Sequence, residues 1–595
     1  MKDSMGQLAV SQRLDERAGA GAHEQALAKL EMLAEEIDAA VSRQKSNGLV
    51  RRAIKAWHRG DVVRASQLSL QATNADETNA QAYHLLAMAL ERMGHMHKAL
   101  VTYEQAFRLD PTDPDLFLNL GLSAWNMKLI DGAAGMFRQY IDKCPTSPLG
   151  YNNLGMIECE QGKTSIAIET LRSAIYRMPE ESILWNSLGT VLAEEGRAEE
   201  SLTFYMEAIR LEPEFSRPYH NIGYALSHLG RLEEALDAYD HALKFVVHDN
   251  ERIEGDHSRS ICLIGMGRLE EGFRDYEVRH NPRFRGYVHH MTNAPLWHGE
   301  DLHGKRILVV AEQGLGDELM FANVLPDIAR AVGENGKLQI AVDPRLVPLF
   351  ARSFPKAEVG AYDDRQMIDP DGAKELRFIP WAAENGEPDF YAPGGTPLQY
   401  LRKRVEDFPK ERFLTPDPER VAQYRKRLEA LGPGPYVGVC WRSMMIDVKR
   451  KKYYSALDFW GPVLNTPNVT FVNVQYGDVK DELAAACAKH GVAIHNFDDL
   501  DLKNDLDGAA ALSAALDLVI SAPTAAAAMA GSVGTPLWFL SAGRTWPQLG
   551  TDHYPWYRDT RAFRPEAFGD WKSVMKDAGE ALAVFVQTRT TENGA

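Results

Sequence analysis

The sequence predicts an α-solenoid of stacked helical hairpins followed by an α/β region. In the first half, one position recurs with a spacing of 34 residues, at Gly60, Gly94, Lys128, Gly162, Gly196 and Gly230. Each of the central repeats ends in a proline, which stops a helix. After about residue 286, short apolar runs alternate with helical stretches, and this alternation is typical of parallel sheets with crossover helices.

The repeat has the columns expected of a two-helix unit. An aromatic column comprises Tyr83, Phe117, Tyr151, Trp185 and Tyr219, and a small-residue column four positions later comprises Ala87, Gly121, Gly155, Gly189 and Gly223. Small residues let two helices approach closely, and the units must stack because one hairpin cannot bury its own apolar face. A period of 34 is that of the tetratricopeptide repeat (TPR). We count about seven units over residues 46–286, the last drifted around Gly267.

Composition restricts the class of protein. The chain has 595 residues, a net charge of −17 and five scattered cysteines, none of them paired at metal-ligand spacing. Its apolar runs are too short to span a bilayer, so we expect no membrane span. The negative charge disfavours nonspecific binding of nucleic acid. These features predict a multidomain cytoplasmic protein without a metal or resident cofactor.

Residues 1–45 form a separate N-terminal segment ahead of the repeats. Leu27, Leu30, Leu33, Ile37 and Val41 give it the apolar spacing of an amphipathic helix. Such a helix either binds a partner or is simply an N-terminal helix or cap of the solenoid, and we expect the second.

Two α/β blocks follow the solenoid. We assign residues 287–430 to a first lobe and residues 431–595 to a second, with a Pro/Gly-rich segment at 432–435 between their strands. Two Rossmann-like lobes of this kind would face each other across a cleft. Ligands of such sheets bind beyond the carboxyl ends of the strands, so residues at those positions are the candidates for binding and catalysis.

The first candidate is the turn after the strand at 306–311. Gly314 and Gly316 let the backbone turn sharply and approach a ligand, and Glu312 and Asp317 flank them. Either carboxylate could act as a general base in the cleft. The alternatives are a strand–helix turn without chemistry and, for Asp317, a helix cap.

Two further strands end in polar residues. Arg442 and Ser443 follow one strand and could bind a phosphate, whereas Lys451 and Lys452 downstream are expected to be solvated. Another strand runs into Gln475, Tyr476 and Gly477, whose main-chain groups could recognise the base of a nucleotide. An ordinary turn that precedes a helix is an equal alternative for this second group.

The last candidate is a strand that ends at Ser521 and is followed by Pro523, Thr524 and a run of alanines to Gly531. Small side chains let a ligand approach the helix N-terminus, where free amides and the helix dipole bind phosphate. The same composition also permits tight packing of the helix on the sheet, and the two interpretations are compatible.

With these motifs the chain resembles bacterial TPR-linked glycosyltransferases of the GT-B type. The segments that carry the resemblance are Trp297–Gly299, Glu312–Asp317, Trp441–Ser443, Gln475–Asp478, Asp517–Thr524, Gly534–Pro536 and Pro555–Tyr557. In size and layout the chain is more narrowly similar to the flagellin-modifying enzymes of the FlmG type. One departure is Ala528, because many relatives place a histidine four residues after the threonine at 524.

The resemblance implies an enzyme that transfers a nonulosonic acid, pseudaminic or legionaminic, from a CMP-linked donor to Ser/Thr of flagellin. It implies that Asn119, Asn153 and Asn221 belong to an asparagine ladder that binds the acceptor in the TPR groove, although Leu85 and Ser187 break this column. Local hydrogen bonding within the repeats is the alternative for each asparagine. The alternative functions are a UDP-GlcNAc-dependent transferase and an inactive TPR adaptor or chaperone.

Overall fold

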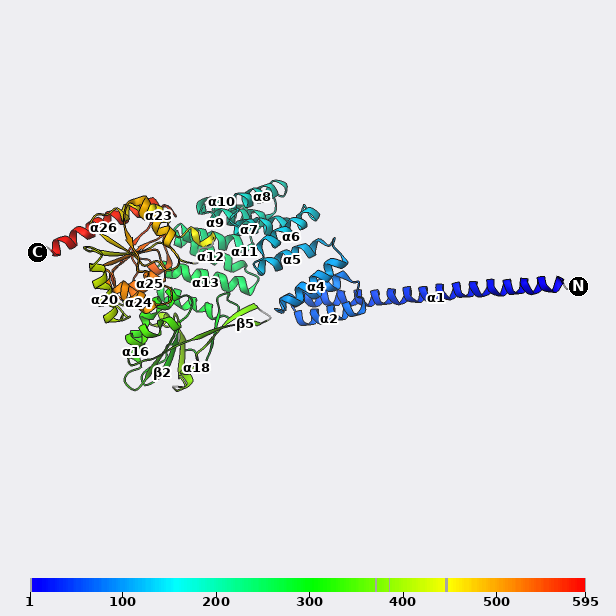
Figure 1. Ribbon diagram of the computed structural model, residues 1–595, viewed down its shortest axis with the longest axis horizontal. Helices are drawn as coiled ribbons and strands as arrows, with labels where there is room; N and C mark the ends of the chain where they lie inside the picture. The colour runs from blue at the N-terminus through cyan, green and yellow to red at the C-terminus, as the bar shows by residue number, and fades with distance from the viewer. Residues whose placement is uncertain (1–2, 370–371, 385, 445–447, 594–595) are drawn as a thin grey trace. The chain divides into compact units, whose positions relative to one another are not determined.

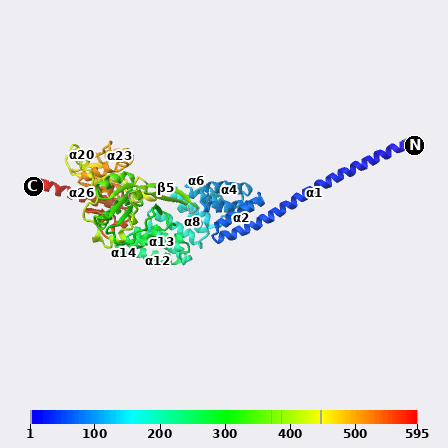
Figure 2. The same ribbon diagram turned by 90° about the horizontal axis from the view of Figure 1, so that it is seen from below.

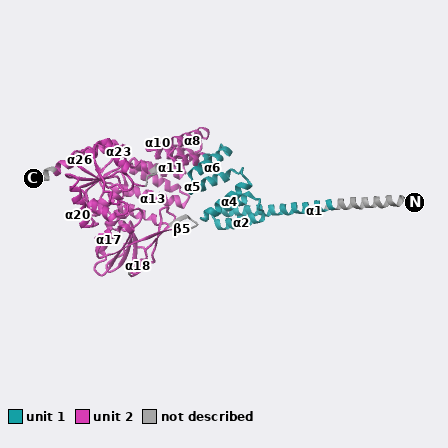
Figure 3. Ribbon diagram, in the orientation of Figure 1, with its two compact units in different colours: residues 1–150, 368–373 teal, residues 151–367, 374–595 magenta. Residues whose placement is uncertain are grey.

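The computed structural model describes residues 3–369, 372–384, 386–444 and 448–593 (Figures 1 and 2). Its backbone divides into two compact units (Figure 3). Unit 1 comprises Met1–Gly150 with Ile368–Ala373, and unit 2 comprises Tyr151–Met367 with Lys374–Ala595. None of the helices within the described ranges is both long enough and apolar enough to cross a membrane.

The predicted solenoid is confirmed, and its described helices form seven consecutive hairpins. The first three are the end of α1 (Asp3–His58) with α2 (Val62–Ala75), α3 (Ala80–Arg92) with α4 (Met96–Leu109), and α5 (Pro114–Asn126) with α6 (Ile130–Lys143). The next three are α7 (Pro148–Glu160) with α8 (Thr164–Arg177), α9 (Ser182–Glu194) with α10 (Ala198–Leu211), and α11 (Ser216–His228) with α12 (Leu232–Phe245). The drifted last hairpin is α13 (Asp249–Gly265) with α14 (Leu269–Asp275).

The 34-residue spacing has a conformational cause. Gly60, Gly94, Gly162, Gly196 and Gly230 adopt φ angles between 74° and 90°, just after the first helix of each hairpin. This left-handed conformation ends a helix, and glycine adopts it without a steric penalty. Lys128 occupies the same position with φ 62°, so the turn is kept where glycine is absent.

The N-terminal segment differs from the expectation. Helix α1 runs without a break from Asp3 to His58, so the boundary predicted after residue 45 falls inside it. Leu30, Ile37 and Val41 are 64%, 60% and 59% exposed. The expected N-terminal helix is therefore present, but it does not bury this apolar stripe as a cap on the solenoid would. The segment lacks a proline or a left-handed glycine that would separate it from the first repeat.

The first α/β lobe is built on a four-stranded parallel sheet. Its strand order is β4-β3-β2-β7, with bounds Glu358–Ala361, Lys337–Val342, Arg306–Val310 and Phe390–Pro393. The helix after β2 is divided into α15 (Leu315–Phe321) and α16 (Leu325–Ala331), joined by a 3-10 turn just before Pro326. A second sheet has the order β1-β6-β5, with bounds Val288–Met291, Gly372–Phe378 and Asp363–Asp369.

The second lobe has a six-stranded parallel sheet. Its order is β10-β9-β8-β11-β12-β13, with bounds Ile494–His495, Thr470–Asn473, Tyr436–Cys440, Leu518–Ser521, Leu537–Leu540 and Thr560–Phe563. Alternate residues of these strands belong to two different apolar clusters. One face packs on α24 (Leu506–Ala515) and α25 (Ala525–Ser532), the other on α23 (Lys480–His490) and α26 (Trp571–Asn593), and Figure 1 shows them on opposite sides.

Helix α20 (Pro418–Glu429) lies before the lobe boundary predicted at residue 430 but packs on the second lobe. Its Arg420, Arg425 and Arg427 pair with Asp505, Asp517 and Asp499, which all belong to that lobe.

The last hairpin shares its core with both lobes. Ile264, Leu269, Phe273 and Tyr276 belong to the same buried cluster as the strands of the first sheet. The ring of Phe273 meets the edge of Trp556 with 6.4 Å between centroids. The drifted unit is therefore the junction at which repeats of unit 2 are fixed to its α/β region.

Candidate functional site

A cavity of about 790 Å³ lies where segments of the two lobes meet. This volume is within the range of small-molecule sites. The residues that line it come from the turn after β2, from the carboxyl ends of β8, β9 and β11, and from helices α24 and α25. Of the twelve predicted catalytic and donor-binding residues, seven line the cavity, namely Gly314, Gly316, Asp317, Ser443, Tyr476, Pro523 and Thr524.

The turn after β2 touches the start of α25. A methyl group built on Gly316 would lie 3.6 Å from both Cα and N of Ala525. This is an ordinary van der Waals distance, so a methyl group would fit at Gly316 and the turn of the first lobe lies directly beside the N-terminus of α25.

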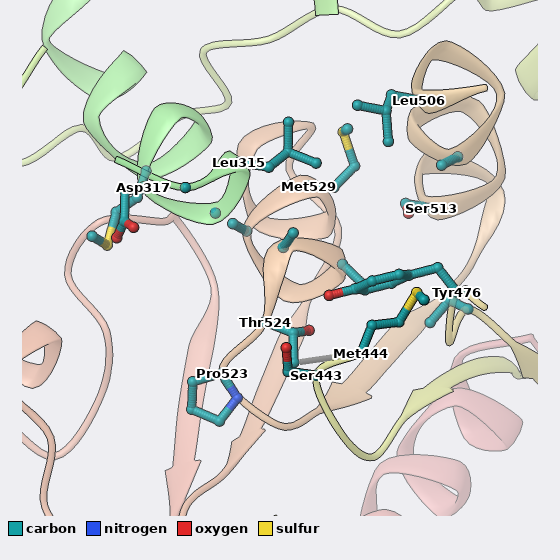
Figure 4. A pocket seen from close by; sticks show the side chains of 18 of the residues that line it. Leu315, Asp317, Ser443, Met444, Tyr476, Leu506, Ser513, Pro523, Thr524 and Met529 are labelled. Atoms are coloured by element: carbon teal, nitrogen blue, oxygen red, sulfur yellow. The ribbon is translucent and has the colours of Figure 1, made fainter. Parts of the chain in front are cut away.

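Asp317 lies on the cavity wall near this contact (Figure 4). Burial raises the pKa of its carboxyl to about 6, and the charge of Glu312 acts in the same direction. A hydrogen bond from the Gly314 amide partly opposes the shift. A carboxylate with a pKa near 6 is mostly ionised at neutral pH and is still a usable proton acceptor.

Glu312 lies outside the lining of this cavity and is engaged elsewhere. Its Oε1 is 2.8 Å from Nη2 of Arg279 and also accepts a hydrogen bond from the Gly395 amide at 2.6 Å. Burial alone would raise its pKa, but Arg279 overrides this effect and lowers the pKa to about 2. Glu312 is thus held in a buried ion pair, whereas Asp317 lies on the cavity wall with a raised pKa.

Thr524 is the N-terminal cap of α25 and lies between Asp317 on one side and Tyr476 on the other (Figure 4). Its side chain makes no capping hydrogen bond. Ala525 and Ala526 also line the cavity, and the first amides of an α-helix have no acceptor within the helix. This arrangement can bind an anion.

Gly531, predicted to bind the donor, does not line the cavity. A methyl group built there would lie 2.5 Å from Cγ of Tyr557. The glycine lets α25 lie directly on the Tyr557 ring, and that ring itself lines the cavity.

Gln475 organises the ends of β8 and β9. Its Oε1 accepts hydrogen bonds from the amides of Trp441 and Arg442 at 3.2 and 3.0 Å. The side chain is 1% exposed, so it shapes the wall without reaching the cavity. Gly477 has φ 97° and forms the turn that follows Tyr476.

Arg442 does not line the cavity, because Glu482 binds its guanidinium, with Nε 3.0 Å from Oε2. The adjacent Ser443 does line it. Lys452, expected to be solvated, instead pairs with Glu194 of the solenoid at 3.0 Å, and both side chains are less than one fifth exposed. That prediction failed because the sequence did not show that α9 lies beside this loop.

The three ladder asparagines make hydrogen bonds within the repeats. Asn119 Nδ2 lies 2.9 Å from Nε2 of His84, and Asn221 Nδ2 donates to Oδ1 of Asn186 at 2.9 Å. Asn153 is buried and accepts a hydrogen bond from Asn152 at 2.8 Å. The local bonding given as the alternative is therefore present at each position, and binding of an acceptor stays a prediction.

Sequence reasoning missed the apolar side of the cavity. Leu502, Leu506 and Ala509 line it from α24 and the preceding loop, and Met529 lines it from α25. No motif marks these residues, because their apolar spacing is also that of an ordinary helix packed on a sheet.

Comparison with known proteins identifies the repeats. Four models described as tetratricopeptide repeat match residues 80–113, 115–147, 152–215 and 204–237. Among solved structures, the TPR protein YrrB is 19% identical over 31% of this chain and 96% of its own, with a TM-score of 0.24. The type IV pilus biogenesis factor PilW is 16% identical over 35% and 96%, with a TM-score of 0.31.

Protein FlbA of Caulobacter vibrioides is 44% identical to the chain over 329 residues. The match covers 55% of this chain and 54% of FlbA, so the chain spans about half the length of this curated relative. The chain thus contains tetratricopeptide repeats, a portion similar to FlbA and a parallel α/β region.

Proposed function

We propose that the chain is a protein O-glycosyltransferase that transfers a nonulosonic acid from a CMP-linked donor to Ser/Thr residues of flagellin. The repeats would bind the flagellin, and the α/β region would bind the donor. The observation that carries this proposal is the cavity in which Asp317 and the N-terminus of α25 lie on neighbouring walls. A base and an anion site side by side suit transfer of a sugar from a phosphate.

The donor would bind with its phosphate at the amides of Ala525 and Ala526. Helix dipole and free amides stabilise the charge of the departing CMP, so the protein itself can stabilise the leaving group. The cytosine base of the donor would lie toward Ser443 and Tyr476. The aromatic ring of Tyr476 offers a surface on which this base can stack.

Asp317 would accept the proton of the acceptor hydroxyl. The hydroxyl oxygen forms the new bond to the anomeric carbon while the bond from that carbon to the phosphate oxygen breaks, and CMP leaves with the electron pair. The raised pKa of Asp317 fits this role because a group that ionises near 6 is available as a base at neutral pH.

A nucleotide screen tests the proposal. CMP should raise the melting temperature of the full chain more than UDP does, and Thr524→Val should keep the fold but reduce the shift. A larger shift with UDP would favour the UDP-GlcNAc-dependent alternative. No shift with any nucleotide would favour an inactive adaptor. Ala528, which stands on the cavity wall where a histidine is expected, supports that alternative.

A further inference from the structure

A second cavity of about 440 Å³ adjoins the first within unit 2. Tyr454, Pro523 and Trp546 line both cavities. One wall of the second cavity comes from helices α11 to α13 of the solenoid, and the other comes from residues 541–546, the loop after β12. A ligand whose phosphate lies at α25 would therefore reach the second cavity past Pro523, the residue before Thr524.

The solenoid wall is polar but uncharged. Tyr453 Oη contacts Nε2 of His228 and lies 3.1 Å from Oη of Tyr224. Burial lowers the pKa of His228, and burial with the charge of Arg279 lowers that of His257 to about 4. Both imidazoles are neutral at neutral pH, so this wall holds neither a cation nor an anion.

The opposite wall carries Arg544, which is half-buried. Across the described ranges of the chain, Arg544 has no ion-pair or hydrogen-bond partner, and neither has the half-buried Arg564. Burial and the charge of Arg544 lower the pKa of Arg564, so the two guanidinium groups repel each other. Asp552 opposes this effect without coming within ion-pair distance.

This pair contrasts with the other arginines of the region. Arg345, Arg352 and Arg420, for example, each pair with an aspartate. The chain has 83 acidic against 66 basic residues, so carboxylates are abundant. Two neighbouring half-buried guanidinium groups without a paired carboxylate destabilise the folded protein. An anion bound beside them would offset this cost.

We propose that Arg544 binds the carboxylate of the transferred sugar where the second cavity meets the first. Guanidinium and carboxylate pair through two parallel hydrogen bonds, and this geometry is specific as well as strong. Arg544 precedes Trp546 by two residues, and Trp546 lines both cavities. The inference rests on the proposed function and deepens it, because a neutral sugar offers Arg544 no charged partner.

The test is calorimetric titration of the full chain with a CMP-nonulosonate and with CMP alone. Arg544→Gln should weaken binding of the CMP-nonulosonate by about tenfold to a hundredfold and leave binding of CMP within about twofold. Arg544→Lys should restore part of the affinity. Arg558→Gln, which removes a charge from an exposed residue of the same lobe, is the matched control and should change neither titration.

Equal affinity of wild type and Arg544→Gln for the CMP-nonulosonate would overturn the inference. It would also be overturned if Arg544→Gln changed only the apparent affinity for the acceptor protein, because the carboxylate would then belong to the acceptor. Failure of the wild-type chain to bind CMP at all would instead contradict the proposed function, so the two failures are distinguishable. Unchanged melting temperatures of the variants would show that each is folded.

Discussion

Arg279 and Glu312 form a buried ion pair, with 2.8 Å between Nη2 of the guanidinium and Oε1 of the carboxylate. Their side chains are 3% and 6% exposed. Arg279 lies in the turn after the last repeat, and Glu312 follows strand β2 by two residues. The pair therefore fixes the end of the solenoid to the turn that carries Asp317.

Glu312→Gln should destabilise unit 2 by about 3 kcal/mol, because Arg279 then keeps a buried charge with one partner fewer. The loss should lie near the lower end for such pairs, since Glu277 still pairs with Arg279 at 2.6 Å. Chemical denaturation, monitored by tryptophan fluorescence, measures this loss of unfolding free energy. The control is Asp249→Asn, which breaks the exposed pair with Arg283 and should cost less than about 1 kcal/mol. Equal losses for both variants would contradict the structural role.

Asp317→Asn should lower kcat/KM for transfer by about a hundredfold or more while CMP binds as in wild type, because the amide cannot accept the proton. Transfer kinetics and a CMP titration on the same preparation measure the two effects. Asp301→Asn, a change at an exposed carboxyl of the same lobe, should leave both unchanged. Retained transfer by Asp317→Asn would exclude Asp317 as the base.

The raised pKa of Asp317 predicts two pH dependences. As a base it must be ionised, so kcat/KM should rise with pH through about 6. For stability, the folded carboxyl binds its proton more tightly than the unfolded one, whose pKa is 3.8. Ionising it therefore costs folding free energy, and its contribution should fall as pH rises from about 4 to about 6, by about 3 kcal/mol.

The stability effect is measured as the difference between wild type and Asp317→Asn. Denaturation at a series of pH values should show the variant gaining on wild type across this window. A difference that does not change with pH would show that the carboxyl has its ordinary pKa in the folded chain.

The repeats offer a matched pair of glycines within unit 1. A methyl group on Gly121 would lie 2.5 Å from Cε1 of Phe137, whose side chain is fully buried, so Gly121→Ala should cost about 1 to 3 kcal/mol. Gly135 lies in α6 with open space around it, so Gly135→Ala should stabilise by up to about 1 kcal/mol. Thermal unfolding of the two variants measures both, and effects of the same sign would contradict the packing.

The repeats were predictable because their signal is periodic and local. A left-handed turn every 34 residues favours glycine, and close helix packing favours small residues, so both appear in the sequence itself. The continuity of α1 was not predictable from the repeat register, because a register marks where a unit starts but does not show whether the preceding helix is interrupted.

The sequence predicted where the candidate site lies, but not which of its charged side chains are held in ion pairs. The rule that ligands bind at the carboxyl ends of parallel strands led to Asp317, Ser443 and Thr524, which all line the cavity. Glu312 and Arg442 also follow strands of these sheets, yet neither lines the cavity. Glu312 is held by Arg279, 33 residues before it, and Arg442 by Glu482, 40 residues after it. Such pairs depend on tertiary packing, and nothing local distinguishes a paired charge from a free one.

The most direct test of the account is transfer itself. The full chain is incubated with purified flagellin and CMP-pseudaminic or CMP-legionaminic acid, and the flagellin is analysed by intact-mass spectrometry. We expect a mass increase of whole nonulosonate residues that requires both the donor and Asp317. Flagellin of unchanged mass, from a preparation that binds both flagellin and CMP, would contradict it.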